Sequence, residues 1–487
     1  MNSNTGKKVT SNLAWRFLER FGAQIVTFIV SIVLARILDP EVYGIIALVT
    51  VFITLLQVFV DSGLGNALIQ KKNADDLDFS TVFYFNIFAC FILYGVMFLL
   101  APLISYFYGN DDLTAIIRVL SLTIVVSGVK NVQQAYVSRN LLFKRFFFAT
   151  LGGTIGAACL GVLLAYLGFG VWALVAQHLF NLVVDTIILW LTVKWRPKRL
   201  FSFSRLKTLF SYGWKLLVSA LLDTSYNEIR SLIIGKQYSA EDLAFYNRGQ
   251  QFPTVIVTNI NYSIDSVLLP TMSAEQDNRT RVKSMTRRAI KTSSFVMMPM
   301  MVGLAICAEP IIRILLTDKW LPAVFFLRIF CIVYAFYPIH TANLNAIKAL
   351  GRSDYFLKLE ILKKTIGLIA IFLTMFISVE AMALSLLVTS FLSQIINSWP
   401  NKKLLNYGYI EQVKDMLPQI ALSIVMGLIV FSVGYLPATD WIKLLIQIPL
   451  GMIVYFGMSY LLKIEAFEYV RYTIGSFLKG KNKTLSL

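Results

Sequence analysis

The chain has 487 residues, of which 57% are hydrophobic and only 15% are charged. This balance excludes an ordinary soluble enzyme of two or three domains, which would carry far more charge. The formal net charge is +18. Because the basic residues lie in short segments between long apolar runs, this charge indicates a membrane protein and argues against nucleic-acid binding.

Apolar runs of about 20 residues, separated by polar or Pro/Gly joints, predict about fourteen transmembrane helices. The first six are expected to begin near Leu13, Tyr43, Ser80, Thr114, Phe146 and Phe169. The next six are expected to begin near Ser211, Gly249, Ala289, Leu321, Leu359 and Glu380. The last two are expected to begin near Met416 and Trp441.

Two stretches about 200 residues apart resemble each other. Each has a Trp at the start of an apolar run (Trp15 and Trp214), a basic residue at its far end (Arg36 and Lys236), an acidic turn and then a Tyr. This duplication predicts two six-helix lobes that keep one orientation in the membrane. We therefore expect an all-α polytopic membrane protein made of an N-terminal lobe, a C-terminal lobe, and two extra helices with a basic tail: residues 1–200, 201–410 and 411–487.

The distribution of Lys and Arg predicts the orientation of the chain. If the N-terminus is cytoplasmic, most basic residues fall in cytoplasmic segments, including Lys194–Lys207 and Arg279–Lys291. The opposite loops are short and hold few basic residues. This asymmetry indicates an even number of spans with both termini in the cytoplasm.

Polar side chains inside the predicted spans are candidates for function, because ionisable groups there usually face a partner or a wet cavity. The seventh span carries a stripe at steps of three and four residues, which places it on one helix face: Lys215, Ser219, Asp223, Tyr226, Asn227 and Arg230. This stripe fits either a cavity wall or a set of structural ion pairs. In the first span, Arg16 and Arg20 fit either a basic membrane boundary or an anion site.

Three groups of candidate site residues follow from this pattern. The cations suited to an anion site are Arg16, Arg20, Lys130, Lys215 and Arg230. The residues suited to line a polar cavity are Gln24, Gln134, Tyr226, Asn227, Asn343 and Asn345. The carboxylates suited to proton or cation binding, each of which also fits a buried ion pair, are Asp61, Asp185, Asp223, Asp265 and Glu360.

Motifs for enzymatic chemistry are absent from the sequence. It has no phosphate-binding loop of the form G-x-x-x-x-G-K-[ST], no G-x-S-x-G nucleophile motif and no Asp/His cluster with metal-ligand spacing. The four cysteines lie within apolar runs, so we expect them to be small core residues. We therefore expect a transporter with no catalytic residue, no metal site and no cofactor, driven by a gradient or by removal of its product.

Three segments resemble the Wzx-type polysaccharide flippases, in particular the colanic acid and teichuronic acid exporter branch. They are Leu34–Gly44 (LARILDPEVYG), Asp61–Gln70 (DSGLGNALIQ) and Val267–Ser273 (VLLPTMS). The resemblance implies membership of the multidrug/oligosaccharidyl-lipid/polysaccharide exporter superfamily. It also implies a fold like that of the multidrug exporters and lipid II flippases, with two lobes that open alternately to the two sides of the membrane.

The resemblance further implies a substrate, undecaprenyl-pyrophosphate carrying an oligosaccharide repeat unit, in the bacterial inner membrane. The cations would then bind the pyrophosphate and the polar residues the sugars, in the synthesis of capsule, exopolysaccharide or O-antigen. A polysaccharide polymerase and a chain-length regulator are the implied protein partners. Two alternatives stay open: a cation-coupled drug or metabolite antiporter of the same fold, and a polysaccharide polymerase or ligase, which would need larger outer loops.

Overall fold

The computed structural model describes residues 3–61 and 63–478; the side chains of residues 3–14, 16, 17, 20, 212, 353, 473, 474 and 476–478 lie outside this description. All regular secondary structure in the described part is helical. Contacts divide the chain into two compact units, Met1–Ala244 (unit 1) and Phe245–Leu487 (unit 2).

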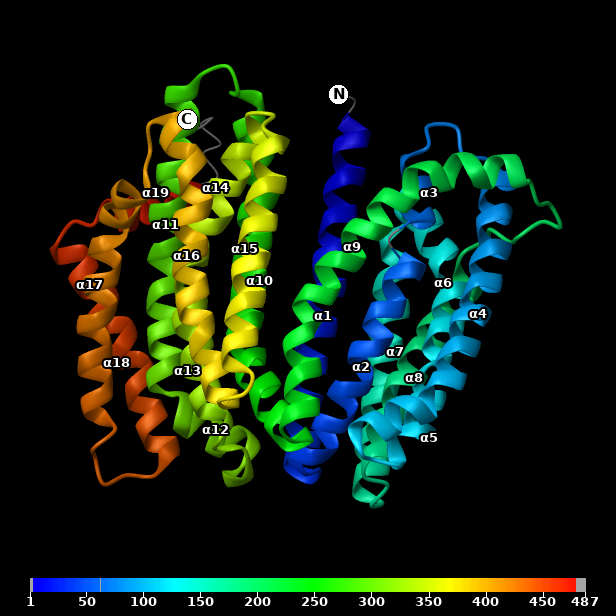
Figure 1. The fold of residues 1–487 in the computed structure, drawn as a ribbon. Coiled ribbons are helices and arrows are strands. Elements are labelled where there is room, and N and C mark those ends of the chain that lie inside the picture. Colours follow the sequence, from blue (N-terminus) through cyan, green and yellow to red (C-terminus); the bar gives the residue numbers. More distant parts are fainter. Residues whose placement is uncertain (1–2, 62, 479–487) are drawn as a thin grey trace. The chain divides into compact units, whose positions relative to one another are not determined.

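Unit 1 is a helical bundle in which α9 crosses the other helices at a slant (Figure 1). Long-range packing is densest where α7 lies against α1 and α8. The helices are α1 Ser3–Ile37, α2 Pro40–Asp61, α3 Leu64–Gln70, α4 Asp76–Tyr108, α5 Asp112–Leu120, α6 Leu122–Arg139, α7 Phe143–Tyr166, α8 Val171–Thr192 and α9 Phe203–Gln237.

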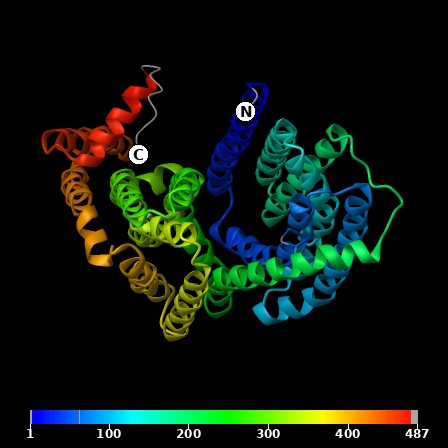
Figure 2. The ribbon, with the colours of Figure 1, turned by 90° about the horizontal axis from the view of Figure 1, so that it is seen from above.

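Unit 2 holds the remaining helices, and Figure 2 shows α17, α18 and α19 at its edge. The first residues of α10 belong to unit 1. The elements are α10 Ala240–Ala274, α11 Arg279–Ile306, α12 Ala308–Leu316, the 3₁₀ turn η1 Asp318–Trp320, α13 Ala323–Ala335, α14 Tyr337–Ala349, α15 Ser353–Thr374, α16 Val379–Leu405, α17 Tyr409–Val433, α18 Asp440–Leu461 and α19 Glu465–Leu478.

Ten helical segments of the described chain are long and apolar enough to cross a membrane. They confirm the expectation of an all-α polytopic membrane protein, and the predicted number of fourteen is approximate. Four further helices at predicted span positions, α1, α9, α10 and α15, fall outside this set. These helices carry most of the polar residues that the sequence marked as candidates, so the same side chains that suggest function lower their hydropathy.

The order of helices repeats between the two halves of the chain. The helices α1 and α9, which open the two predicted lobes, are both 35 residues long. The predicted spans that begin near Thr114 and Leu321 are each divided into two helices, α5–α6 and α13–α14, with breaks at Ser121 and Phe336. The compact units place α9 with the helices before it, whereas the predicted lobe boundaries follow the sequence repeat and stay a prediction.

Two glycines permit close helix contacts in unit 1. A Cβ atom on Gly44 of α2 would lie 1.7 Å from the backbone oxygen of Ala240, at the start of α10. A Cβ atom on Gly128 of α6 would lie 2.6 Å from Sγ of Cys90 on α4. Since neither distance leaves room for a carbon atom, these crossings depend on glycine.

Candidate functional site: a polar cavity in unit 1

One face of α6 is polar over most of its length. Its side chains recur at steps of four, three, four and four residues, so they point to the same side of the helix. All five line a cavity of about 670 Å³: Thr123, Ser127, Lys130, Gln134 and Ser138. The structure therefore brings the predicted residues Lys130 and Gln134 together in one cavity.

The other polar walls of this cavity come from α1, α2, α7 and α8, and Leu120 of α5 adds an apolar side chain. The first four helices contribute Glu19 from α1, Gln57 from α2, Thr150 from α7, and Asn181 and Asp185 from α8. Thr150 donates a hydrogen bond from Oγ1 to Oε1 of Glu19 (3.3 Å), and Glu19 is only 8% exposed. A cavity lined by carboxylates, amides and hydroxyls among apolar helices is suited to a polar or charged ligand.

Lys130 and Asp185 form an ion pair across the cavity. Nζ of Lys130 contacts Oδ2 of Asp185, and the two side chains are 14% and 10% exposed. The other carboxylate oxygen, Oδ1, is buried and has no hydrogen-bond partner within the described residues. The pairing neutralises the charge that Lys130 would otherwise offer to an anion, and its predicted role in anion binding stays a prediction.

A chain of hydrogen bonds surrounds Asp61 at the end of α2. Its Oδ2 accepts from Nε2 of Gln57 (3.0 Å), and its Oδ1 accepts from Nδ2 of Asn131 (3.2 Å). Nδ2 of Asn86 donates in turn to Oδ1 of Asn131 (3.3 Å). Since Gln57 also lines the cavity, the predicted coupling residue Asp61 lies within hydrogen-bonding reach of the cavity wall.

The predicted residues of α9 form a group apart from this cavity. Lys215, Asp223 and Asn227 are exposed, whereas Tyr226 and Arg230 are half-buried. Nδ2 of Asn227 donates to Oδ2 of Asp223 (3.4 Å) one turn earlier. None of the five lines the cavity. The stripe is present on the helix as expected, and the functions assigned to its members stay predictions.

For the two cations predicted near the start of the chain, the structure describes the backbone only. Arg16 and Arg20 lie in α1, but their side chains fall outside the described residues. Gln24, the next predicted residue of α1, is half-buried and does not line the cavity.

The predicted polar residues of unit 2 lie in hydrogen-bond networks. Asn343 is fully buried; its Nδ2 donates to Oε1 of Gln412 (2.7 Å), and its Oδ1 accepts from Nδ2 of Asn401 (2.6 Å). Nδ2 of Asn345 donates to Oδ1 of Asp265 (2.5 Å). Such amide networks join neighbouring helices to one another.

Glu360 of α15 is paired within its own helix. Its Oε1 lies 2.6 Å from Nζ of Lys363, one turn later. The structure thus places the predicted coupling residues Asp265 and Glu360 each against one polar neighbour. Within the described residues, no group of three or more His, Cys, Asp and Glu side chains has the arrangement of a metal site.

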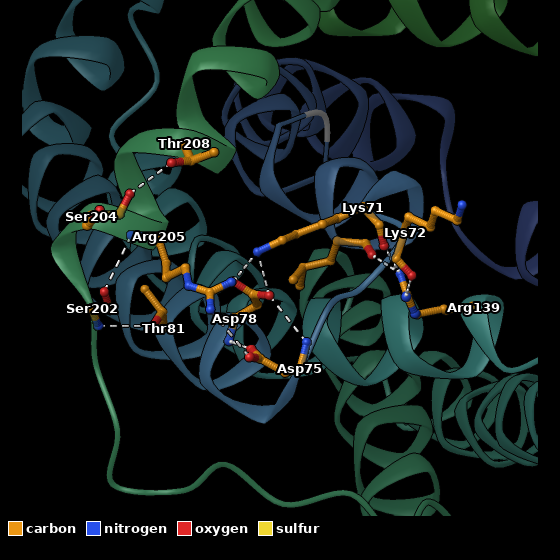
Figure 3. Close-up of polar contacts among 11 residues, drawn as sticks. Lys71, Lys72, Asp75, Asp78, Thr81, Arg139, Ser202, Ser204, Arg205 and Thr208 are labelled. Carbon is orange, nitrogen blue, oxygen red and sulfur yellow. Dashed lines mark hydrogen bonds and ion pairs between the residues drawn. The ribbon is translucent and has the colours of Figure 1, made fainter.

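A second polar cluster joins the α3–α4 connection to the start of α9 (Figure 3). Nζ of Lys71 lies 2.6 Å from both carboxylate oxygens of Asp78, and Nη1 of Arg205 lies 3.4 Å from Oδ1 of Asp78. The Asp78 backbone N–H donates to Oδ1 of Asp75 (2.9 Å), which lowers the pKa of Asp75. Backbone N–H groups of Lys198 and Ser202 also donate to Ser80 and Thr81 of α4. The cluster therefore fixes the α8–α9 connection and the start of α9 against α4.

Arg139 completes this cluster at the end of α6. Its guanidinium donates to the backbone oxygens of Leu68 and Lys72, each at 2.8 Å. It therefore holds the end of α3, and the turn that follows it, against the helix that carries Lys130 and Gln134 (Figure 3).

Several cavity residues were not among the candidates from the sequence. Thr123, Ser127 and Asn181 are uncharged and common in membrane helices, so singly they give no signal. The spacing of the polar face of α6 was a usable signal. The pairing of Lys130 with Asp185 was not, because 55 positions separate the two residues and nothing local relates them.

A family model described as "Polysaccharide biosynthesis protein" matches residues 33–325. The chain is 24% identical to the succinoglycan biosynthesis transport protein ExoT of Rhizobium meliloti, over 64% of each chain. It is also 24% identical to the teichuronic acid biosynthesis protein TuaB of Bacillus subtilis, over 61% of this chain and 62% of that protein. The matched region thus spans slightly less than two thirds of these relatives.

Among solved structures, the chain resembles the lipid II flippase MurJ in an inward closed conformation. The TM-score is 0.75 at 16% sequence identity, and the match covers 92% of this chain and 98% of that one. At this identity the likeness shows a shared fold.

Proposed function

The chain belongs to the polysaccharide biosynthesis protein family, and on this premise we propose that it is a flippase for lipid-linked oligosaccharides. The membership confirms the family resemblance predicted from the sequence. The proposed substrate is an oligosaccharide repeat unit on undecaprenyl-pyrophosphate, moved across the bacterial inner membrane by alternating access. Both termini would lie in the cytoplasm, and the product would enter capsule, exopolysaccharide or O-antigen synthesis.

The observation that carries this proposal is a polar cavity inside a bundle of membrane-spanning helices. Sugar hydroxyls and a charged headgroup cannot cross hydrocarbon without compensating contacts, because an unpaired polar group there costs several kcal/mol. Amides and hydroxyls such as Gln57, Gln134 and Asn181 can form hydrogen bonds with sugars. The names of the relatives, a succinoglycan transport protein and a teichuronic acid biosynthesis protein, agree with a polysaccharide precursor as cargo.

Negative charge on the substrate requires cations, and the proposal assigns them to α1 and α9. Arg16, Arg20, Lys215 and Arg230 would offset the charge of the pyrophosphate. Arginine is suited to this task because its planar guanidinium forms paired hydrogen bonds with phosphate oxygens.

The test is complementation of a strain that lacks the gene. Arg16, Arg20, Lys215 and Arg230 are each replaced by Ala, and surface polysaccharide is measured at matched protein levels. Arg36→Ala and Lys207→Ala remove a cation from the far end of α1 and the near end of α9 and serve as controls. The proposal expects reduced polysaccharide for the first group only. Normal export by all four variants would refute the cationic route.

A second candidate, a cation-coupled drug or metabolite antiporter, is favoured by one observation. Among its described side chains, the cavity of unit 1 holds two carboxylates, Glu19 and Asp185, against the single cation Lys130. A strain without the gene separates the two functions. Raised drug sensitivity with unchanged surface polysaccharide would support the antiporter, whereas lost polysaccharide with unchanged drug sensitivity supports the flippase.

A further inference from the structure

Unit 2 contains a second hollow, with a different chemical character from the cavity of unit 1. It has a volume of about 600 Å³ and lies between α10, α11 and α19. The surface that faces this hollow is mainly apolar and includes Ile260, Ile264 and Leu268 from α10 and Ala289 and Val296 from α11; Ser and Thr side chains of both helices also line it. We call this hollow the α10–α11 groove.

The groove is elongated along its two walls. The residues that line it run from Asn259 to Thr271 on α10 and from Ser284 to Val296 on α11. Twelve residue steps correspond to about 18 Å along a helix axis. A long, narrow, apolar hollow of this kind fits a hydrocarbon chain better than it fits a compact polar ligand.

Among the described residues that line this groove, Arg288 is the one cation. Arg288 lines it together with Tyr469 from α19, and the guanidinium carbon lies 5.1 Å from the centre of the Tyr469 ring. Arg288 is exposed, and it has no carboxylate partner within the described residues. Cation–π contact orients the guanidinium but leaves its charge uncompensated.

The neighbouring cations of α11 differ from Arg288 in this respect. Arg287 lies 2.6 Å from Asp415, Lys283 lies 3.4 Å from Glu411, and Lys291 lies 2.7 Å from Glu465. Each of these three is therefore at least partly neutralised by a carboxylate of α17 or α19, and Arg288 is left as the cation that faces the groove.

The depth of Arg288 follows from the helix that bears Tyr469. The span α18 ends at Leu461, and α19 begins at Glu465 after a short link. Lys291 contacts Glu465, and the rings of Phe295 and Phe467 lie 6.1 Å apart, so α19 is held against α11. Arg288 and Tyr469 thus lie near the end of a membrane span, where lipid phosphates and interfacial tyrosines are found.

We propose that the α10–α11 groove binds one acyl chain of an anionic phospholipid whose phosphate is held by Arg288. The acyl chain would lie in the groove against its apolar side chains, and the guanidinium of Arg288 would donate to two phosphate oxygens. One uncompensated cation matches a phosphodiester, which carries one negative charge. It matches a prenyl diphosphate less well, since that group carries about two, so this site is distinct from the transport substrate.

The test uses the full-length protein in nanodiscs that contain phosphatidylglycerol and phosphatidylcholine with identical acyl chains. Lipid that stays bound after purification is counted by native mass spectrometry. The wild type is expected to retain phosphatidylglycerol over phosphatidylcholine by about fivefold, the ratio that corresponds to about 1 kcal/mol per basic residue. Arg288→Gln should abolish this preference.

Arg279→Gln is the matched control, because it removes the same charge from the same exposed helix end outside the groove. It should retain the preference. Ala289→Trp fills the groove and should reduce retention of both lipids. Equal retention by the wild type and Arg288→Gln would overturn the proposal, as would full displacement of phosphatidylglycerol by an equimolar prenyl diphosphate.

A second measurement is independent of any variant. Phosphatidylglycerol with a photoreactive group at the end of one acyl chain is crosslinked to the wild-type protein, and the labelled peptides are identified. Labels within residues 259–271 or 284–296 are expected. Labels spread evenly over the lipid-facing helices, with no enrichment in these segments, would contradict a defined site. Neither result depends on whether the protein transports an oligosaccharide.

Discussion

Lys130 and Asp185 lie on α6 and α8, one on each side of the cavity of unit 1, and both side chains are largely buried. An ion pair of this kind gains little net stability as a pair, but removal of one member leaves the other charge buried without compensation. The pair therefore joins the two helices only while both side chains are present.

Replacement of Lys130 by Ala, or of Asp185 by Ala, is expected to lower the free energy of unfolding by about 3–5 kcal/mol. Lys130→Met combined with Asp185→Leu should cost less than either single change, because no uncompensated charge remains. Thermal unfolding of the purified variants in one detergent measures the difference. A double variant as unstable as the sum of the single variants would show that the two residues do not act as a pair.

Residue-scale prediction from the sequence succeeded where a local pattern existed. The stripe of α9, which includes Asp223, was predicted from its helical spacing. The polar face of α6 has similar spacing, but only its members Lys130 and Gln134 were predicted, each as a single candidate. Their partners could not be assigned. Asn345 contacts Asp265 across 80 positions, and Asn343 contacts Gln412 across 69, and a single sequence gives no relation over such distances.

At the scale of helices, close crossings in unit 1 depend on small residues. Gly44→Ala places a Cβ atom within 1.7 Å of the backbone oxygen of Ala240, so the starts of α2 and α10 must separate. We expect a loss of about 1–3 kcal/mol in stability, or more if the backbone cannot shift.

The control for this change is Gly95→Ala in the middle of α4, where an added Cβ atom meets no atom within 4 Å. This variant should be neutral or slightly stabilising, because alanine favours the helix over glycine. Melting temperatures in detergent compare the two variants. Equal effects of both changes would show that the Gly44 crossing has no steric basis.

The cluster in Figure 3 fixes the segment between α8 and α9 against α4. Asp78, whose side chain is fully buried, accepts from both Lys71 and Arg205. Asp78→Ala removes both contacts, and limited digestion by trypsin is expected to cut faster between Lys194 and Lys207. Asp111→Asn, an exposed change elsewhere in unit 1, should leave the digestion rate unchanged. A normal rate for Asp78→Ala would contradict the anchoring role.

Helix-scale prediction was accurate in type and less accurate in number. Runs of about 20 apolar residues identified the long spans, because that length of helix crosses the hydrocarbon core of a bilayer. The break at Ser121 was not predicted, since no proline or glycine lies beside it. The break at Phe336 was also missed, although Pro338 in the first turn of α14 is a usual signal of a helix start. The short helix α19 was read as part of a tail, although its contacts with α11 make it a packed element.

For the whole molecule, the sequence predicted both the family and the helical fold, and the comparisons confirm both. The two lobes inferred from the sequence repeat stay a prediction. The polar helices α1, α9, α10 and α15 are not identified as membrane spans by length and hydropathy, unlike their neighbours. A protein that moves a polar headgroup through a bilayer needs helices of this kind, because the headgroup must find hydrogen bonds and opposite charges along its path.

The central claim, that the protein moves a lipid-linked oligosaccharide between leaflets, is tested most directly in proteoliposomes. Undecaprenyl-pyrophosphate with a fluorescent oligosaccharide is incorporated into both leaflets, and a membrane-impermeant quencher is added outside. The account predicts that nearly all of the fluorescence becomes accessible over time when the protein is present. If only the outer-leaflet fraction is quenched, as in protein-free vesicles, the account is contradicted.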